Sequence, residues 1–160
     1  MNRPALPVLT ILKGVLVFLG IGALAGGLVL IIAPDGAIIH MPTSLLARTP
    51  FTNFLIPGLI LFSVNGLFPL FNAYALHKQP SWSALNPLGA PFGEHWSFVT
   101  TGAQGIALVI WISVELLTIG SHWLMVFYGV VGLLIIALTL SPAVRGALKT
   151  PRLSTRAVAG

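Results

Sequence analysis

Four long apolar runs limit what this chain can fold into more than any other feature of its sequence. They lie at about residues 14–33, 51–76, 98–119 and 123–140. A helix of about 20 apolar residues crosses the roughly 30 Å of hydrocarbon in a bilayer, and each run is long enough for that. The runs therefore predict an all-α membrane protein, a bundle of four transmembrane helices that forms a single domain.

The composition agrees with lipid, and not water, as the main solvent of this chain. Hydrophobic residues make up 56% of the sequence and charged residues only 7%, whereas soluble domains carry roughly 25% charged residues. The net charge of +5 does not indicate nucleic-acid binding, because the basic residues are few and scattered and form no patch interleaved with aromatic residues. The sequence has no cysteine, which excludes thiol catalysis, thiolate metal sites and disulfide exchange.

The positions of the basic residues predict the orientation of the bundle. If the amino terminus is cytoplasmic, Arg48 is the one basic residue outside, and the inner segments carry all the others. These others are Arg3, Lys13, Lys78, Arg145, Lys149, Arg152 and Arg156. Cytoplasmic loops carry an excess of lysine and arginine, so both termini are expected in the cytoplasm, with a basic tail over 142–160.

The first two runs contain residues that should control helix packing. Gly22 and Gly26 have the spacing that lets two helix backbones approach closely, which predicts a tight crossing within the chain, with a dimer interface as the alternative. In the second run, Pro69 removes a backbone donor and predicts a kink. Asn65 and Asn72 are seven residues apart, so they share a helix face that should point into the bundle.

The loop at 77–97 is rich in proline and glycine, which argues against a long helix there. Trp82 and Trp96 are expected to lie at the membrane interface. Glu94 precedes the third helix, where a carboxylate favours the positive end of the helix dipole. We therefore expect a polar connection whose acidic residue acts as a helix cap.

The third run contains Glu115, the one acidic residue inside a long apolar segment. A carboxylate in hydrocarbon costs up to a few kcal/mol unless it is paired, protonated or in contact with water, so such a residue is a functional candidate by default. Helical spacing places it in a stripe with other polar side chains. The favoured interpretation is structural: Glu115 hydrogen-bonds to Tyr128, Asn53 or a loop amide and locks two helices together. The alternative is a ligand or proton pocket near the outer face, lined by Glu115, Trp111, Gln104, Tyr128, Asn65 and Arg48.

A metal site can also be written down at this end of the bundle. Its ligands would be Asp35, His40, Glu115 and His122, and histidine with carboxylate suits zinc, copper or iron. These residues come from separate segments and show none of the usual ligand spacings. No metal or other cofactor is therefore predicted, and the metal site remains the weaker alternative.

One stretch carries a family resemblance. The sequence PFTNFLIPGLILF at residues 50–62, with Gly66 after it and WISVE at 111–115, resembles small four-helix proteins of the bacterial inner membrane. The resemblance covers residues 14–140. It implies the helical fold and the inner (plasma) membrane as location, and it implies no activity.

Two classes of function follow from these observations. In the first, the chain is an accessory or assembly subunit, or an independent helical module, and is not an enzyme. Its partners are then the lipid bilayer, other membrane subunits or a second copy of the chain. In the second, the pocket centred on Glu115 belongs to a minimal transporter or to a membrane enzyme that acts on a lipophilic substrate.

Overall fold

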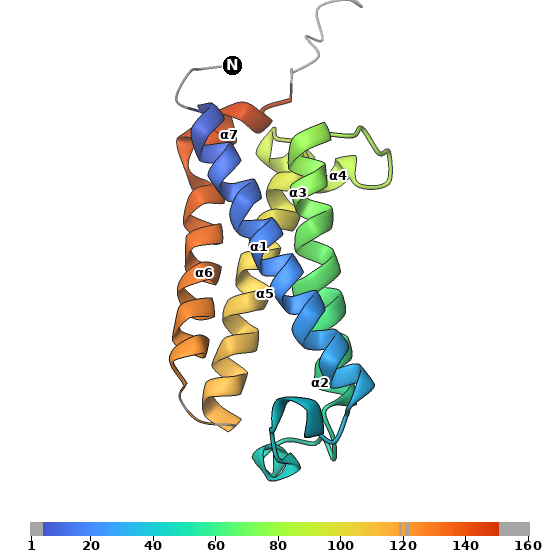
Figure 1. The fold of residues 1–160 in the computed structure, drawn as a ribbon. Coiled ribbons are helices and arrows are strands. Elements are labelled where there is room, and N and C mark those ends of the chain that lie inside the picture. The colour runs from blue at the N-terminus through green and yellow to red at the C-terminus, as the bar shows by residue number, and fades with distance from the viewer. Residues whose placement is uncertain (1–4, 119, 121, 151–160) are drawn as a thin grey trace, which may run out of the picture.

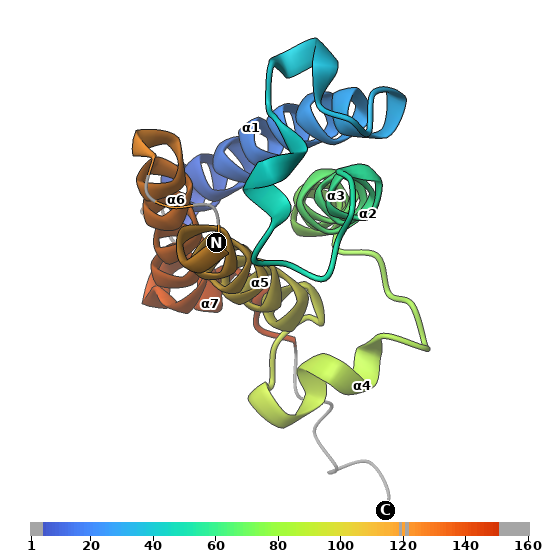
Figure 2. The same ribbon diagram turned by 90° about the horizontal axis from the view of Figure 1, so that it is seen from below.

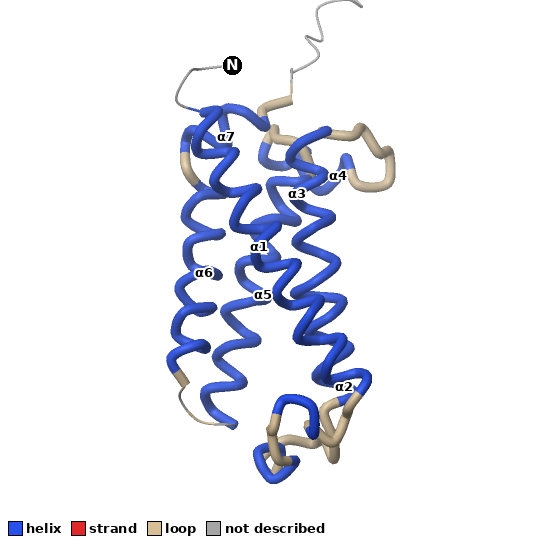
Figure 3. Tube along the Cα trace, in the orientation of Figure 1, coloured by secondary structure: helices blue, strands red, loops and turns tan. Residues whose placement is uncertain are grey.

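The computed structural model describes residues 5–118, 120 and 122–150, and over these residues the chain is helical. Helix accounts for 78% of the described residues, and none of them belongs to a strand. Figure 3 shows the helices joined by short loops. Four helices are long and apolar enough to cross a membrane: Leu6–Ile32, Leu55–Lys78, Ser97–Thr118 and Trp123–Leu140.

The first two spans pack along each other. Helix α1 (Ala5–Ile32) contacts the whole second span, which consists of α2 (Leu55–Ile60), the π-helical segment η3 (Leu61–Leu67) and α3 (Phe68–Lys78). Figure 1 shows α1 crossing in front of the other spans, and Figure 2 shows the second span beside it. These elements form one half of the bundle.

The last two spans form the other half. Helices α5 (Ser97–Thr118) and α6 (Trp123–Leu140) make an antiparallel hairpin and pack closely along their length. The short connection between them forces this arrangement, as expected from the sequence. The two halves share a core of leucine, isoleucine, valine and phenylalanine side chains, among them Leu12, Leu16, Leu19, Leu108 and Ile135.

Paired glycines set the closest helix contacts. A Cβ atom added to Gly27 of α1 would lie 2.9 Å from the carbonyl oxygen of Gly58, and one added to Gly105 of α5 would lie 3.0 Å from that of Gly132. Gly22 and Gly26, which the sequence suggested as the close crossing, would be 3.1 and 3.5 Å from side-chain atoms. The tight crossing therefore exists within the chain, but Gly27 forms it.

The second span begins at residue 55 and not at 51, and its irregular backbone lies ahead of Pro69. Within η3 the bonding pattern is π-helical, and the Phe68 N–H donates to the carbonyl of Ser63. Proline lacks the N–H that an α-helix needs at that point, so the turn before it is where the pattern can change. Ahead of Pro69, where a kink was expected, the structure has a π-helical turn in which Asn65 and Gly66 are buried.

Two segments near the chain ends are more ordered than their composition suggests. Helix α1 begins at Ala5 and not near residue 14, because Leu9 and Leu12 are buried in the core beside α7. Helix α7 (Pro142–Leu148) occupies the start of the expected basic tail and buries Val144 and Leu148. Arg3, Arg152 and Arg156 lie outside the described residues.

The two ends of the bundle carry different structures. We call the end that holds α7 and the start of α1 the terminal end; residues 79–96, with α4 (Asn86–Gly89) and η4 (Ala90–Phe92), lie there too (Figure 1). We call the opposite end the loop end. It holds the α5–α6 turn and residues 33–54, which contain the short helices η1 (Ala37–Ile39) and η2 (Thr43–Leu46).

Candidate functional site

Glu115 lies in α5 near the loop end and is half-buried. Trp111, one turn earlier on the same helix, is the side chain beside its carboxyl. The Tyr128 hydroxyl is directed at α1, where it would lie 3.1 Å from a Cβ atom on Gly22. No hydrogen bond between side chains of the described residues joins Tyr128 to Glu115, so the expected lock between α5 and α6 is not formed.

Gln104 and Asn65, also expected in this pocket, belong to a different place. Gln104 is roughly 16 Å from Glu115 along α5, at about 1.5 Å per residue. Its Nε2 donates to Asn65 Oδ1 at 3.3 Å, which joins α5 to η3 inside the bundle. Asn72 Nδ2 donates to the Thr100 carbonyl, also at 3.3 Å, and joins α5 to α3. The asparagine face therefore points inward, as the spacing of Asn65 and Asn72 predicted.

These contacts belong to what we call the interior polar seam, four fully buried side chains: Asn65, Asn72, Thr101 and Gln104. One polar atom of each has no hydrogen-bond partner, namely Asn65 Nδ2, Asn72 Oδ1, Thr101 Oγ1 and Gln104 Oε1. In the Asn65–Gln104 pair, exchanging the oxygen and nitrogen of both side-chain amides would still leave one polar atom of each without a partner. The seam therefore joins the two halves of the bundle with incompletely paired hydrogen-bonding groups.

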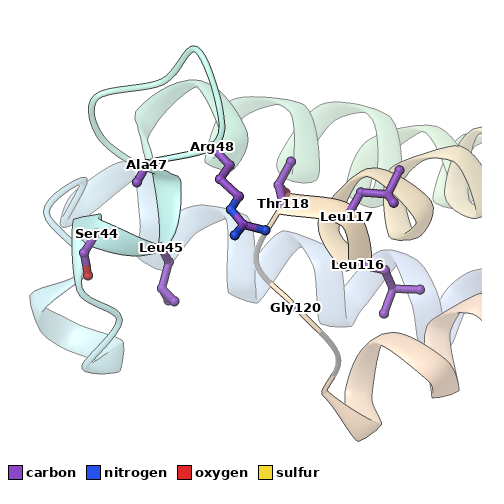
Figure 4. A pocket seen from close by; sticks show the side chains of 8 residues that line it. All are labelled: Ser44, Leu45, Ala47, Arg48, Leu116, Leu117, Thr118 and Gly120. Carbon is purple, nitrogen blue, oxygen red and sulfur yellow. The ribbon is translucent and has the colours of Figure 1, made fainter.

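Arg48 lies in a cavity of about 360 Å³ between residues 33–54 and the end of α5. We call it the loop-end cavity. It is lined by Ser44, Leu45, Ala47, Arg48, Leu116, Leu117, Thr118 and Gly120. Figure 4 shows the Arg48 side chain extending from the loop toward the end of α5. The cavity lies within the size range of small-molecule sites, about 300–1,000 Å³.

The cavity exists because the loop is attached to one half of the bundle. Phe54 and Leu46 pack on Leu30 of α1, and the Phe54 N–H donates to the Pro34 carbonyl at 2.7 Å. Helix α5 meets the second span mainly at α3, and α2 makes no comparable contact with it among the described residues. The loop therefore covers the space beside the end of α5 without filling it.

The four candidate metal ligands are not brought together. Asp35 Oδ1 accepts a hydrogen bond from the Ala37 N–H at 3.1 Å, and His122 Nδ1 caps α6 by accepting from the Leu124 N–H at 3.4 Å. Over residues 5–118, 120 and 122–150, no three side chains of the usual ligand types are grouped so that they could hold a metal ion. Asp35 and His122 thus act locally in turns and caps.

A charged pair at the terminal end was missed by the sequence analysis. Glu94 is only 3% exposed, and its Oε1 accepts a hydrogen bond from Arg145 Nε at 2.7 Å. The guanidinium of Arg145 also lies over the ring of Phe98, 5.6 Å from its centroid. Glu94 therefore pairs with α7 and does not simply cap α5. The sequence signal was an acidic residue in a loop at the same end of the bundle as Arg145.

An aromatic stack lies at the same end of the bundle. Trp96 is buried, stacks against Phe71 and Trp82, and donates through Nε1 to the Pro80 carbonyl at 2.9 Å. His95 pairs with the same carbonyl through Nε2 and with Ser97 Oγ through Nδ1. The expectation that Trp96 is an interface anchor is wrong, because its ring fills the core; Trp82 is partly exposed.

Backbone hydrogen bonds complete the terminal end. The His95 N–H donates to the Leu148 carbonyl at 2.7 Å, and the Thr150 N–H donates to the Gly93 carbonyl at 3.2 Å. A Cβ atom on Gly89 would collide with the backbone of Glu94 and Trp96, so the loop packs closely upon itself. Residues 79–96 and α7 therefore form one structured cap.

No protein-family model, curated protein or solved structure matches this chain. A functional assignment therefore rests on the geometry of three places. These are the apolar surface of the four spans, the half-buried carboxyl of Glu115, and the loop-end cavity that contains Arg48.

Proposed function

We propose that this chain is a multi-pass protein of the bacterial inner membrane that acts as an accessory or assembly module for other membrane proteins. The observation that supports this most is the outer surface of the bundle. Each of the four spans exposes large apolar side chains, for example Ile21, Leu67, Ile110 and Val130. Soluble monomers rarely expose contiguous apolar patches of more than a few hundred Å². Lipid and the spans of other proteins are the surroundings that would cover such a surface.

The orientation proposed for the bundle has the terminal end in the cytoplasm. Among the described residues, Lys78, Arg145 and Lys149 lie at or near that end, and Arg48 lies at the loop end. The excess of basic residues on the cytoplasmic side of membrane proteins supports this orientation. The loop-end cavity would then face the periplasmic side.

Cysteine labelling tests insertion and orientation together, because the natural chain has no cysteine to give a background signal. Thr43→Cys and Ser83→Cys each place one thiol in an exposed loop position, at the loop end and at the terminal end. In intact spheroplasts, a membrane-impermeant maleimide should label position 43 and not position 83 until the membrane is opened. Labelling of position 83 alone would reverse the orientation, and recovery of the protein in the soluble fraction would exclude insertion.

Site-specific photo-crosslinking tests the accessory role. A photoreactive amino acid at the exposed Leu133 of α6 should form a cross-link to one defined membrane protein in native membranes. The same group at the buried Ile135, two residues further along the helix, is the matched control and should react only within the chain. Cross-links from position 133 to lipid alone would contradict an assembly role for this face.

A second candidate function is supported by Glu115. Its half-buried carboxyl lies on the apolar helix α5, next to Leu116, which lines the loop-end cavity. A carboxyl so placed can exchange a proton or bind a substrate, as in a minimal transporter or a membrane enzyme that acts on a lipophilic substrate. Infrared difference spectra should then show a carboxyl band that responds to pH and disappears in a folded Glu115→Gln variant. The absence of such a band would exclude proton exchange at this residue.

A further inference from the structure

The loop-end cavity combines one cation, Arg48, with three leucine side chains in a lining that also contains Ser44 and Thr118. We propose that it binds a lipid with a phosphate-containing headgroup, with the Arg48 guanidinium on the phosphate and the side chains of α5 along the first part of an acyl chain. This inference rests on the membrane insertion proposed above and goes beyond it by assigning a ligand class to one site. The accessory role of the protein is independent of it.

The charge of Arg48 carries the first step. The one ion pair found among the described residues joins Glu94 and Arg145, so the Arg48 guanidinium has no carboxylate partner there. The carboxylate of Asp35, which belongs to the same segment 33–54, accepts a hydrogen bond from the Ala37 N–H within its own turn. Arginine presents a rigid planar fork of N–H donors that matches the oxygens of a phosphate group, and it holds that geometry better than lysine. The Arg48 guanidinium, which forms no ion pair among the described residues, therefore favours an anionic group in the cavity.

The walls of the cavity carry the second step. Leu45 comes from the loop, and Leu116 and Leu117 come from the last turn of α5. Leu117 is 79% exposed, which is costly in water and favourable beside an acyl chain. A soluble anion such as inorganic phosphate would use Arg48 but leave these apolar side chains uncovered. An amphipathic anion would both pair with the Arg48 guanidinium and cover these leucine side chains.

The position of the cavity agrees with a lipid ligand. If α5 spans the bilayer, its last turn lies where the hydrocarbon meets the headgroups, and Arg48 faces that turn from the loop. From the water into the bilayer, the phosphate of a lipid comes first and its acyl chain second. In the cavity, Arg48 of the loop and then the leucine side chains of α5 follow the same order. An arginine at an interface ordinarily contacts many lipids transiently, whereas a walled site should retain one lipid when the bilayer is removed.

Native mass spectrometry of the full-length protein, released from mild detergent after exchange into phosphatidylglycerol, tests the proposal. We expect one retained phosphatidylglycerol per chain and at least a tenfold weaker retention in Arg48→Gln. Arg48→Lys keeps the charge without the fork and should lie between the two. Lys78→Gln removes a charge that is also exposed, at the terminal end, and should retain the lipid as the natural protein does. Equal retention by Arg48→Gln and the natural protein would overturn the proposal.

Filling the cavity gives a test that leaves Arg48 in place. Ala47 lines the cavity and is exposed, so Ala47→Trp should occupy the space and abolish retention of the lipid. Ala37→Trp makes the same change in the same loop outside the cavity and should have no effect. Unchanged thermal unfolding of these variants in detergent shows that the loss is local. Loss of the lipid in Ala37→Trp as well as in Ala47→Trp would contradict a site at the cavity.

Two further ligands separate the parts of the proposed interaction. Diacylglycerol has the acyl chains without phosphate, and inorganic phosphate has the anion without chains. Both should bind at least tenfold more weakly than phosphatidylglycerol. If inorganic phosphate binds as well as the lipid does, the site belongs to a soluble anion. If diacylglycerol binds as well, Arg48 does not select the ligand. Either result rejects the lipid site without affecting the cysteine-labelling test of insertion.

Discussion

At the terminal end, α7 and residues 79–96 are bound to each other and to spans on both sides of the bundle, whereas at the loop end residues 33–54 are attached mainly to α1 and α2. The terminal end contains the Glu94–Arg145 ion pair and the aromatic stack around Trp96. The loop end contains an exposed arginine and a cavity of about 360 Å³. Both ends are loops over the same four-helix bundle, but one is filled and the other is open.

The difference shows how an apolar bundle can combine rigidity with access. Burial of aromatic rings and a charge pair ties three segments together at the terminal end, so local opening there must break several contacts at once. Opening at the loop end has to separate a smaller cluster, which is centred on Leu30, Leu46 and Phe54. We therefore expect substitutions at the terminal end to change stability, and those at the loop end to change binding.

The largest effect is expected from Trp96→Ala. Its ring is buried among Phe71, Trp82 and His95, and replacing a buried tryptophan by alanine typically costs about 3–5 kcal/mol. Leu45→Ala, which enlarges an existing cavity at the loop end, should cost about 1 kcal/mol or less, because little packing is lost. Unfolding by SDS in mixed micelles measures both. Equal losses would remove the contrast between the two ends.

A smaller effect is expected from Arg145→Gln. The substitution leaves the carboxylate of Glu94 buried without its counter-ion. Because Arg145 is 46% exposed, we expect the free energy of unfolding to fall by about 2 kcal/mol, which is less than the full cost of breaking a buried pair. Adding Glu94→Gln should restore more than half of the loss, because no buried charge then remains. A double-mutant cycle measures this coupling, and additive losses would show that the pair is not coupled.

The interior polar seam lies between the two ends, and substitutions in it should lower the free energy of unfolding by less. Gln104→Leu removes the partner of Asn65, and hydrogen bonds between membrane helices are worth about 0.6 kcal/mol on average and up to about 1.7. Asn65→Leu combined with Gln104→Leu should be less destabilising than Gln104→Leu alone, since the Asn65 amide is then not left buried without its partner. The same SDS titration tests this order, and a double variant less stable than Gln104→Leu would contradict it.

The smallest change in stability is expected from Arg48→Gln. Arg48 is exposed and has no carboxylate partner among the described residues, so the free energy of unfolding should change by no more than about 0.5 kcal/mol. The comparison with Arg145→Gln uses the same substitution at the opposite end of the bundle. A loss of stability as large as that at Arg145 would show that the loop end is also held by charge.

The spans were predictable because their signal is local. Residues 98–119 and 123–140 were expected as helices, and the structure has Ser97–Thr118 and Trp123–Leu140. The start of α1 was placed nine residues too late, because the polar Lys13 and Thr10 hide a helix whose Leu9 and Leu12 are buried against α7. That burial depends on residues more than a hundred positions away, which no local pattern reveals.

The candidate site was predictable only in part. Helical spacing correctly placed Asn65 and Asn72 on an inward face, but Asn65 and Gln104 were expected beside Glu115 near the outer face and instead pair with each other inside the bundle. Counting residues along each helix gives the depth of a side chain but not its rotation about the helix axis. Tyr128 was therefore expected beside Glu115, whereas its hydroxyl lies against Gly22 of α1. Arg48 was expected in one pocket with Glu115, and the structure places it in a cavity of its own beside the end of the same helix.

The sequence by itself determined the helical class, the number of long apolar spans and their order along the chain. It could do so because the length and apolar character of a run are properties of consecutive residues. Only the tertiary structure decided that Glu94 pairs with Arg145, that Trp96 fills the core, and that Arg48 lines an open cavity. Those contacts join residues far apart in the chain, and they depend on how each helix is rotated and where its neighbours end, which consecutive residues do not specify.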